Sequence, residues 1–199
     1  MKVVESGLSG EAGAIDNDGA GTLLAHLSSW IHSNRNRGLS RIDISEKLIA
    51  AYGADRVLWS AGVRGRDVTD FHISRVARFT DPGRVLINLP VLLSAENPFH
   101  LPAFDTHDVL VAADLDVEAI PLPGSPRIKQ INAAQAYTDF YVLNGAVLAP
   151  EFGDEQTDAI AKDAAVSARV IKVANSPLFR GNQTIENLRM ATTRLGVNY

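Results

Sequence analysis

The 199-residue chain is 46% hydrophobic and 21% charged, which is enough apolar material for one globular domain or part of one. Its net charge of -4 argues against nucleic acid or an acidic membrane surface as a partner, and no segment is apolar over the length of a membrane-spanning helix. The absence of cysteine excludes disulfides and thiolate metal sites, and a cytoplasmic location is the default expectation.

A repeat of 62 residues organises the chain. Gly21, Gly83 and Gly145 recur at this spacing, and each lies at the turn of a similar apolar hairpin. A fixed period of this length indicates a repeated supersecondary unit, and the Asp-Gly and Asn-Gly dipeptides in two of the hairpins accept the positive φ angles of tight turns. Because repetition around an axis brings equivalent residues together, we expect a functional site near that axis.

The first hairpin is followed by a predicted helix and a third strand. Ser40, with Asp43 three residues later, is a candidate N-cap, and Gly53 lies where a C-terminal cap belongs. Residues 57–59 follow as a short strand. The order of elements in the unit is therefore β-β-α-β.

The same order is predicted twice more. Asp105 is expected to cap the second helix, with residues 118–120 as its strand, and Asp154 opens the third helix, with residues 170–173 as the closing strand. The predicted units cover residues 8–62, 68–124 and 135–176, and a C-terminal remnant covers 177–199.

Residues 70–79 alternate between apolar and polar side chains, which predicts a half-buried strand. On this pattern Asp70, His72 and Ser74 share one face. His72 and Glu11 precede the turn glycines of their units by nearly equal distances, so we expect them to converge at the axial end of the fold. A structural hydrogen-bonded pair of Asp70 and His72 at a strand edge is the alternative, and spacing alone favours it.

The other histidines and the basic residues carry weaker signals. Arg35, Arg37 and Arg41 form a basic cluster in a linker, for which a solvated loop is the expected structure. Four histidines lack metal-ligand spacing, so we expect them to be surface or structural residues and expect no metal. They are His26, His32, His100 and His107.

Four segments resemble the agmatine deiminase and bacterial-type peptidylarginine deiminase family. They occur in the family's order and include EAGAID, NRNRGLS, RGRDVTDFHISRVARF and NGAVLAP, within residues 11–24, 34–40, 64–79 and 137–154. The resemblance implies an α/β-propeller of the pentein type, a ring of five β-β-α-β units. This chain would hold about three units and the remnant, so we expect the family's N-terminal units to be missing.

Members of this family hydrolyse a guanidinium group to a ureido group and release ammonia, without a metal or organic cofactor. The reaction needs carboxylates to hold the planar cation, a thiolate to attack its carbon and a histidine to move protons. By resemblance, Glu11 and Asp70 are substrate-binding carboxylates, and His72 is the general acid and base.

Two family positions are altered. The resemblance places Ser74 where the family has an aspartate and Asn187 where it has the catalytic cysteine. We therefore expect a family member for agmatine or peptidyl arginine, within polyamine or arginine metabolism, whose catalysis is impaired. One alternative is a non-catalytic binding or regulatory homologue that forms a homo-oligomer or pairs with an intact family member. Another is a degenerate, truncated gene product that does not fold stably.

Overall fold

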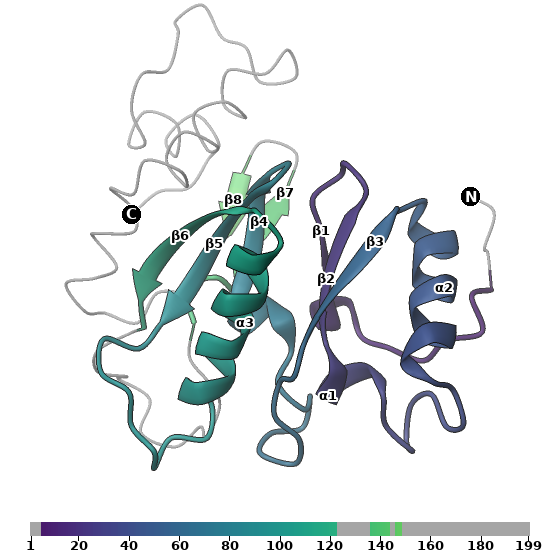
Figure 1. The fold of residues 1–199 in the computed structure, drawn as a ribbon, viewed down its shortest axis with the longest axis horizontal. Helices are drawn as coiled ribbons and strands as arrows, with labels where there is room; N and C mark the ends of the chain where they lie inside the picture. The colour runs from purple at the N-terminus through teal and green to yellow at the C-terminus, as the bar shows by residue number, and fades with distance from the viewer. Residues whose placement is uncertain (1–4, 123–135, 144–145, 149–199) are drawn as a thin grey trace, which may run out of the picture.

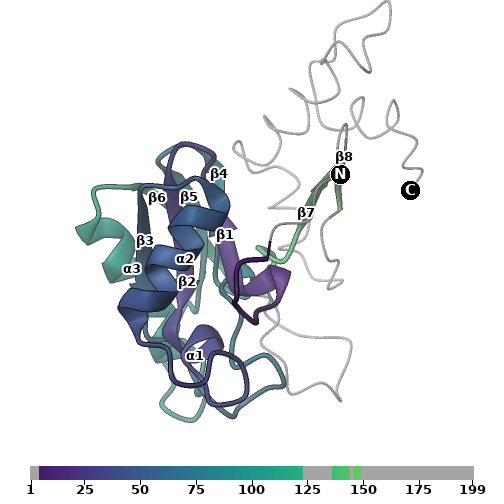
Figure 2. The ribbon, with the colours of Figure 1, turned by 90° about the vertical axis from the view of Figure 1, so that its right-hand side faces the viewer.

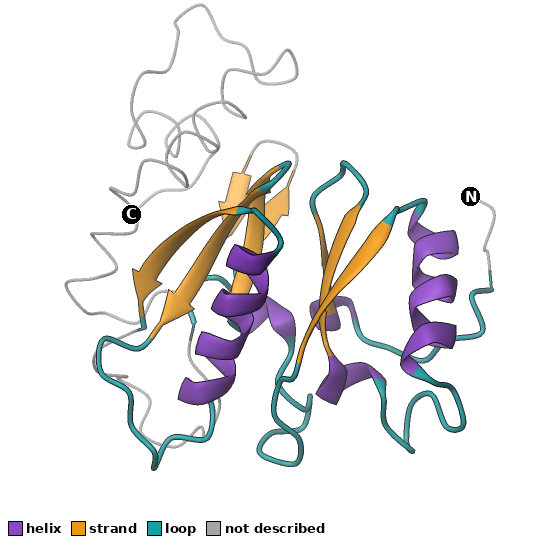
Figure 3. Cartoon of the chain, viewed as in Figure 1, coloured by secondary structure: helices purple, strands orange, loops and turns teal. Residues whose placement is uncertain are grey.

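The computed structural model describes residues 5–122, 136–143 and 146–148. The described chain forms two similar α/β units side by side and a third hairpin (Figures 1 and 3). The strands are β1 (Ile15–Asn17), β2 (Thr22–His26), β3 (Arg56–Ser60), β4 (Ala77–Asp81), β5 (Arg84–Leu89), β6 (Asp116–Pro121), β7 (Tyr141–Leu143) and β8 (Ala146–Leu148). The α-helices are α1 (Leu27–Trp30), α2 (Arg41–Tyr52) and α3 (His100–Ala112), and the 3-10 helices are η1 (Ala12–Ala14) and η2 (Ile73–Arg75).

The first two sheets have the same connections. In each, a hairpin is antiparallel and its second strand pairs in parallel with a third strand, giving the orders β1-β2-β3 and β4-β5-β6. Gly21 and Gly83 have φ angles of 100° and 75°, and their carbonyl oxygens accept hydrogen bonds from the amides of Arg56 and Asp116 at the start of the third strand. These two glycines are therefore structurally equivalent, as the repeat predicts.

The third hairpin, β7–β8, is antiparallel and lies on the opposite side of the sheets from α3 (Figure 2). Its predicted turn glycine, Gly145, lies outside the described residues, and so do the helix expected after Asp154 and the strand expected at 170–173.

Helix α2 begins and ends where the sequence predicts. The Ser40 hydroxyl accepts a hydrogen bond from the Asp43 amide at 3.2 Å, and the Asp43 carboxylate accepts one from the Ser40 amide at 2.7 Å. This reciprocal capping box satisfies amides that the first turn leaves without a partner. Gly53 ends the helix with a φ angle of 64°.

Helix α3 begins earlier than predicted. Its first residue follows Phe99, and Asp105, the predicted cap, lies inside the helix. The Asp105 carboxylate instead accepts a hydrogen bond from the Ala61 amide at 2.8 Å, just after β3. No side chain caps the start of α3. The ring of Phe99, the residue before the helix, packs against the Phe71 ring with 4.8 Å between the centroids.

Residues 70–76 do not form the predicted strand, which begins only at Ala77. Asp70 and Phe71 have φ angles of 56° and 65°, in the left-handed region that non-glycine residues seldom occupy, and η2 follows. The alternation rule is therefore wrong for this segment. Its apolar members, including Phe71 and Ile73, are nevertheless buried.

Asp67 explains why this segment turns. Its Oδ1 accepts hydrogen bonds from the amide and hydroxyl of Thr69 and from the amide of Phe71, at 2.7 to 3.0 Å. Burial raises the pKa of Asp67, but the hydrogen bonds from the Phe71 amide and from the hydroxyl and amide of Thr69 outweigh it and leave the pKa below its usual 3.8. The ionised carboxylate thus accepts hydrogen bonds from amides that would otherwise pair with a neighbouring strand.

Among the described residues, the buried apolar side chains form two clusters that lie on opposite faces of β2. The second unit's cluster includes Leu24 of β2 together with Phe71, Val85 and Leu110. The first unit's cluster contains Leu23 and the inward face of α2. None of the helices among the described residues has the length and apolar character needed to cross a lipid bilayer.

Buried polar side chains at the ends of β2 and β5 reach into the following unit. His26 Nδ1 lies 2.6 Å from the Phe71 carbonyl oxygen and Nε2 lies 3.1 Å from the Thr106 hydroxyl. The neutral imidazole can donate from Nδ1 and accept at Nε2, so both ring nitrogens are satisfied. Asn88, 62 residues later, donates to the Thr138 hydroxyl. His26 is therefore structural, as expected.

We predict that His26 makes the folded state sensitive to acid. Burial lowers the pKa of His26 from 6.5 to about 4, so between these values the unfolded chain binds more protons than the folded chain. The free energy of unfolding should therefore fall by roughly 3 kcal/mol as the pH falls through this window. Denaturant titrations at several pH values measure this. His26→Gln should flatten the dependence, whereas the surface control His107→Gln should not, and parallel curves for all three proteins would contradict the prediction.

Candidate functional site

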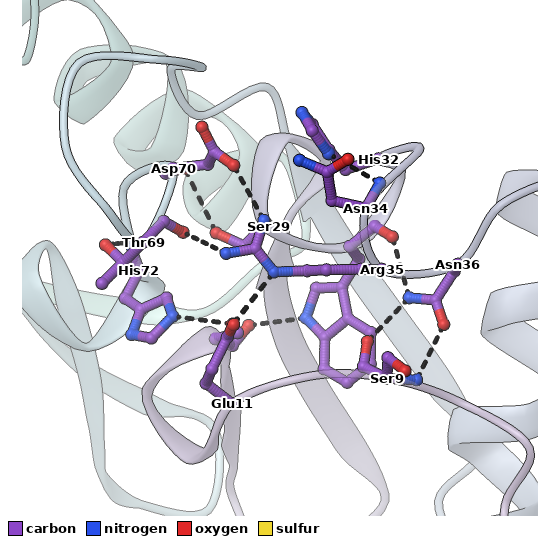
Figure 4. A network of polar contacts seen from close by, with 12 residues as sticks. Ser9, Glu11, Ser29, His32, Asn34, Arg35, Asn36, Thr69, Asp70 and His72 are labelled. Atoms are coloured by element: carbon purple, nitrogen blue, oxygen red, sulfur yellow. Dashed lines mark hydrogen bonds and ion pairs between the residues drawn. The ribbon is translucent and has the colours of Figure 1, made fainter.

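The two 3-10 helices lie against each other where the first two units meet. Glu11 immediately precedes η1, and His72 immediately precedes η2. The two residues therefore occupy equivalent positions of adjacent units, as the repeat predicts, although each lies in a turn and not in a strand. His72 Nε2 is 3.1 Å from Glu11 Oε2 (Figure 4).

Arg35 joins this pair to Asp70. Its Nε lies 3.1 Å from both carboxylate oxygens of Glu11, and its Nη1 lies 2.7 Å from Asp70 Oδ2. Nη2 points toward the Thr69 carbonyl oxygen at 3.4 Å. The Arg35 side chain is only 11% exposed, whereas that of Glu11 is 48% exposed. The structure thus brings Glu11, Asp70 and His72 into one network with Arg35 at its centre (Figure 4).

The solvated loop expected for the basic cluster is therefore wrong for Arg35. Asn36 holds this part of the loop, because its Oδ1 accepts from the Ser9 amide and its Nδ2 donates to the carbonyls of Ser9 and Trp30, each at 2.9 Å. The Trp30 indole in turn donates to the Ala14 carbonyl at 2.8 Å. The loop is thus tied to the segment that carries Glu11.

Both oxygens of the Asp70 carboxylate have partners. Oδ1 accepts a hydrogen bond from the Gly65 amide at 2.7 Å, and Oδ2 accepts from Arg35. The Asp70 carbonyl oxygen accepts from the hydroxyls of Ser28 and Ser29 in α1. Asp70 therefore belongs to the second unit by sequence, but its main-chain and side-chain contacts hold it against the first.

The electrostatics of the network favour the charged forms. Burial raises the pKa of Glu11, but hydrogen bonds from His72 and Arg35 leave it below 4.5. Burial likewise raises the pKa of Asp70, and the Gly65 amide and Arg35 bring it below 3.8. Burial lowers the pKa of Arg35, but its hydrogen bonds to Asp70 and Glu11 outweigh this and raise the pKa above its usual range. At neutral pH the two carboxylates and the guanidinium are all ionised.

Gly13 in η1 allows the close approach of His72. A Cβ atom built on Gly13 would lie 2.6 Å from His72 Nδ1 and 3.1 Å from the Ser74 hydroxyl oxygen. Ser74 is buried and lies beside His72 through η2, not through strand alternation. Asn187, the other altered family position, lies outside the described residues.

Arg35 and Gly13 were not among the site residues that sequence reasoning singled out. Both lie in the segments NRNRGLS and EAGAID that resemble the family, and this was the available signal.

The arrangement can hold a cation and exchange a proton. Glu11 and Asp70 supply negative charge, and His72 Nε2 is within hydrogen-bond reach of a half-exposed carboxylate. Among the residues that the structure describes, no cluster of three or more histidine, aspartate or glutamate side chains could hold a metal ion.

Comparisons with known proteins point to one family. The model of the Porphyromonas-type peptidyl-arginine deiminase family matches residues 1–186. An agmatine deiminase of Medicago truncatula is 29% identical over 74% of this chain and 46% of its own length, and one of Pseudomonas fluorescens is 27% identical over 89% and 55%. The chain spans about half the length of the curated relatives it matches.

Solved structures show the same fold. A substrate-bound agmatine deiminase from C. jejuni superposes with a TM-score of 0.68 at 24% identity, over 89% of this chain and 55% of that one. The expected fold class, part of a pentein-type α/β-propeller, is therefore confirmed.

We predict that Gly13→Ala disturbs the site through His72. The added methyl group cannot be accommodated unless the imidazole moves, and overpacking of this kind costs about 1–3 kcal/mol. Denaturant unfolding measures the loss, and Ala12→Ser on the exposed side of η1 should stay within about 0.5 kcal/mol of the unaltered chain.

A double-mutant cycle identifies the source of this loss. In a His72→Ala background, the cost of Gly13→Ala should be smaller because the ring is absent. Equal costs in both backgrounds would show that His72 is not the obstacle.

Proposed function

Because the chain belongs to the Porphyromonas-type peptidyl-arginine deiminase family, we propose that Glu11, Asp70 and His72 form the cation-binding and proton-transfer part of a guanidinium site. The observation that supports this most directly is the convergence of the three side chains from two units. Carboxylates match a planar guanidinium through paired, charge-assisted hydrogen bonds, and a neighbouring imidazole can exchange protons with the leaving group or with water.

The proposed ligand is a guanidinium compound, either agmatine or an arginine side chain in a peptide. Relatives named agmatine deiminase support the first, and the family's description supports the second. In the reaction proposed for the lineage, the C–N bond to one amino group breaks, water supplies the oxygen of the ureido product, and ammonia leaves. Polyamine or arginine metabolism is the corresponding setting.

We also propose that this chain does not complete that reaction alone. Its 199 residues include no cysteine, so no thiolate is available as the nucleophile that the resemblance implies. Ser74 has no negative charge with which to replace the family's aspartate, and a serine hydroxyl is a poor nucleophile without a dedicated base. A charge-assisted hydrogen bond contributes roughly 1.5–3 kcal/mol, so its loss weakens cation binding about tenfold or more.

Incubation with agmatine tests this. We expect no ammonia or carbamoylputrescine above the level of a His72→Ala control, because the nucleophile is absent, while the agmatine deiminase of Medicago truncatula serves as the positive control for the assay. Ammonia release by the unaltered chain that His72→Ala abolishes would overturn the proposal of impaired catalysis.

Binding of agmatine, measured separately by calorimetry, should be weak and should weaken further in Glu11→Gln. Affinity that does not change in this variant would contradict the assigned site.

A second candidate is a non-catalytic homologue that associates with another protein of its family, in the simplest case a second copy of itself. Three consecutive apolar side chains after β5, Val91, Leu92 and Leu93, are all exposed, with Leu92 at 81%. A cluster of this kind favours association, since isolated apolar residues are ordinary on a protein surface but contiguous ones often mark an interface.

We predict self-association that depends on this cluster. Sedimentation velocity of the unaltered chain should show a mass that rises with concentration, and Leu92→Ser with Leu93→Ser should shift it toward the monomer because the apolar contact is lost. Val68→Ser removes a single side chain that is 95% exposed and should leave the mass unchanged. A compact, heat-stable monomer at every concentration would contradict the association.

A further inference from the structure

We propose that Arg35 occupies the guanidinium site of its own chain, so that a small guanidinium compound binds between Glu11 and Asp70 when the Arg35 side chain is removed or displaced. The inference rests on the proposed function in assigning this pair of carboxylates to guanidinium compounds. It adds the identity of the group that fills the site in the free protein.

The contacts of Arg35 are those that a guanidinium ligand would make. All three guanidinium nitrogens are directed at the site: Nε at the Glu11 carboxylate, Nη1 at Asp70 and Nη2 at the Thr69 carbonyl oxygen. The acceptors therefore surround a planar cation, and their two carboxylates come from different units. Few other cations match this arrangement, because an ammonium group is a compact donor without the planar fork.

The site attracts an external cation most strongly once Arg35 has gone. Two carboxylates and one guanidinium give the trio a net charge of -1, and removal of Arg35 leaves -2 in a partly buried place. The attraction for a small cation is then stronger and less screened than at the surface. The tie of Asn36 to Ser9 and Trp30 holds the Arg35 backbone in position, so the internal guanidinium competes at a high effective concentration.

A second arginine provides the matched comparison. Arg84 also lies between two carboxylates, with Nε 3.3 Å from Asp116 and Nη2 3.1 Å from Glu118, but its side chain is 45% exposed. Arg84 therefore also pairs with two carboxylates, but its side chain is not buried as that of Arg35 is. If burial and enclosure create the site, only the position of Arg35 should accept a ligand in place of the removed side chain.

The experiment replaces the removed atoms. Arg35→Ala deletes the part of the side chain beyond Cβ, which corresponds to ethylguanidinium. Thermal unfolding of the unaltered 199-residue chain, Arg35→Ala and Arg84→Ala is followed with increasing ethylguanidinium, kept well below denaturing concentrations, and with ethylammonium at equal ionic strength. We expect a saturable rise in the unfolding midpoint of Arg35→Ala with ethylguanidinium, and an apparent dissociation constant at least about tenfold lower than for the unaltered chain. Adding Asp70→Asn to Arg35→Ala should abolish the response.

Equal responses of the three proteins to ethylguanidinium would overturn the inference. If Arg35→Ala does not fold alone, folding on addition of ethylguanidinium but not ethylammonium supports it. If neither compound restores folding of Arg35→Ala, the inference is overturned.

Agmatine separates this inference from the proposed function. Suppose that agmatine binds the unaltered chain as tightly as it binds Arg35→Ala, and that Glu11→Gln lowers this affinity. This result would refute the inference that Arg35 fills the site, but it would still support the proposed guanidinium site. Equal stabilisation of Arg35→Ala by ethylguanidinium and ethylammonium would refute both.

Discussion

Two consecutive residues with left-handed backbone, Asp70 and Phe71, form the joint between the first two units. The carbonyl oxygens of both point into the first unit, where they accept hydrogen bonds from His26, Ser28 and Ser29. A non-glycine residue in the left-handed region costs on the order of 1–3 kcal/mol of stability. Aspartate adopts this conformation more readily than phenylalanine does. The contacts made by the two carbonyls and by the Phe71 ring offset that cost.

The same joint sends three consecutive side chains in three directions. The Asp70 carboxylate turns toward Arg35, the Phe71 ring enters the core and stacks on His26 at 5.2 Å, and His72 reaches Glu11. An extended strand would place alternate side chains on one face and could not separate Asp70 from His72 in this way. The core and the polar network therefore depend on one backbone geometry, and a change in it would affect both.

Local signals in the sequence predict most of the regular structure, because hairpin glycines and the Ser40 capping box act over a few residues. The repeat also predicts the meeting of Glu11 and His72. The turn before β4 could not be read from alternation, since it depends on the buried Asp67 carboxylate. The burial of Arg35 could not be predicted from composition either. The local sequence of an arginine-rich linker is the same whether an arginine faces water or pairs with two carboxylates from distant segments.

The large sequence distance across the polar network has a consequence for folding. Glu11 and His72 are 61 residues apart, whereas each hairpin closes over a few residues. Closing a long loop is entropically more costly than forming a local turn, so the strands and α2 are expected to form before the two units dock. The network then appears only at the last step. Its contacts would be the first to be lost in partial unfolding, when far-ultraviolet circular dichroism still reports native secondary structure.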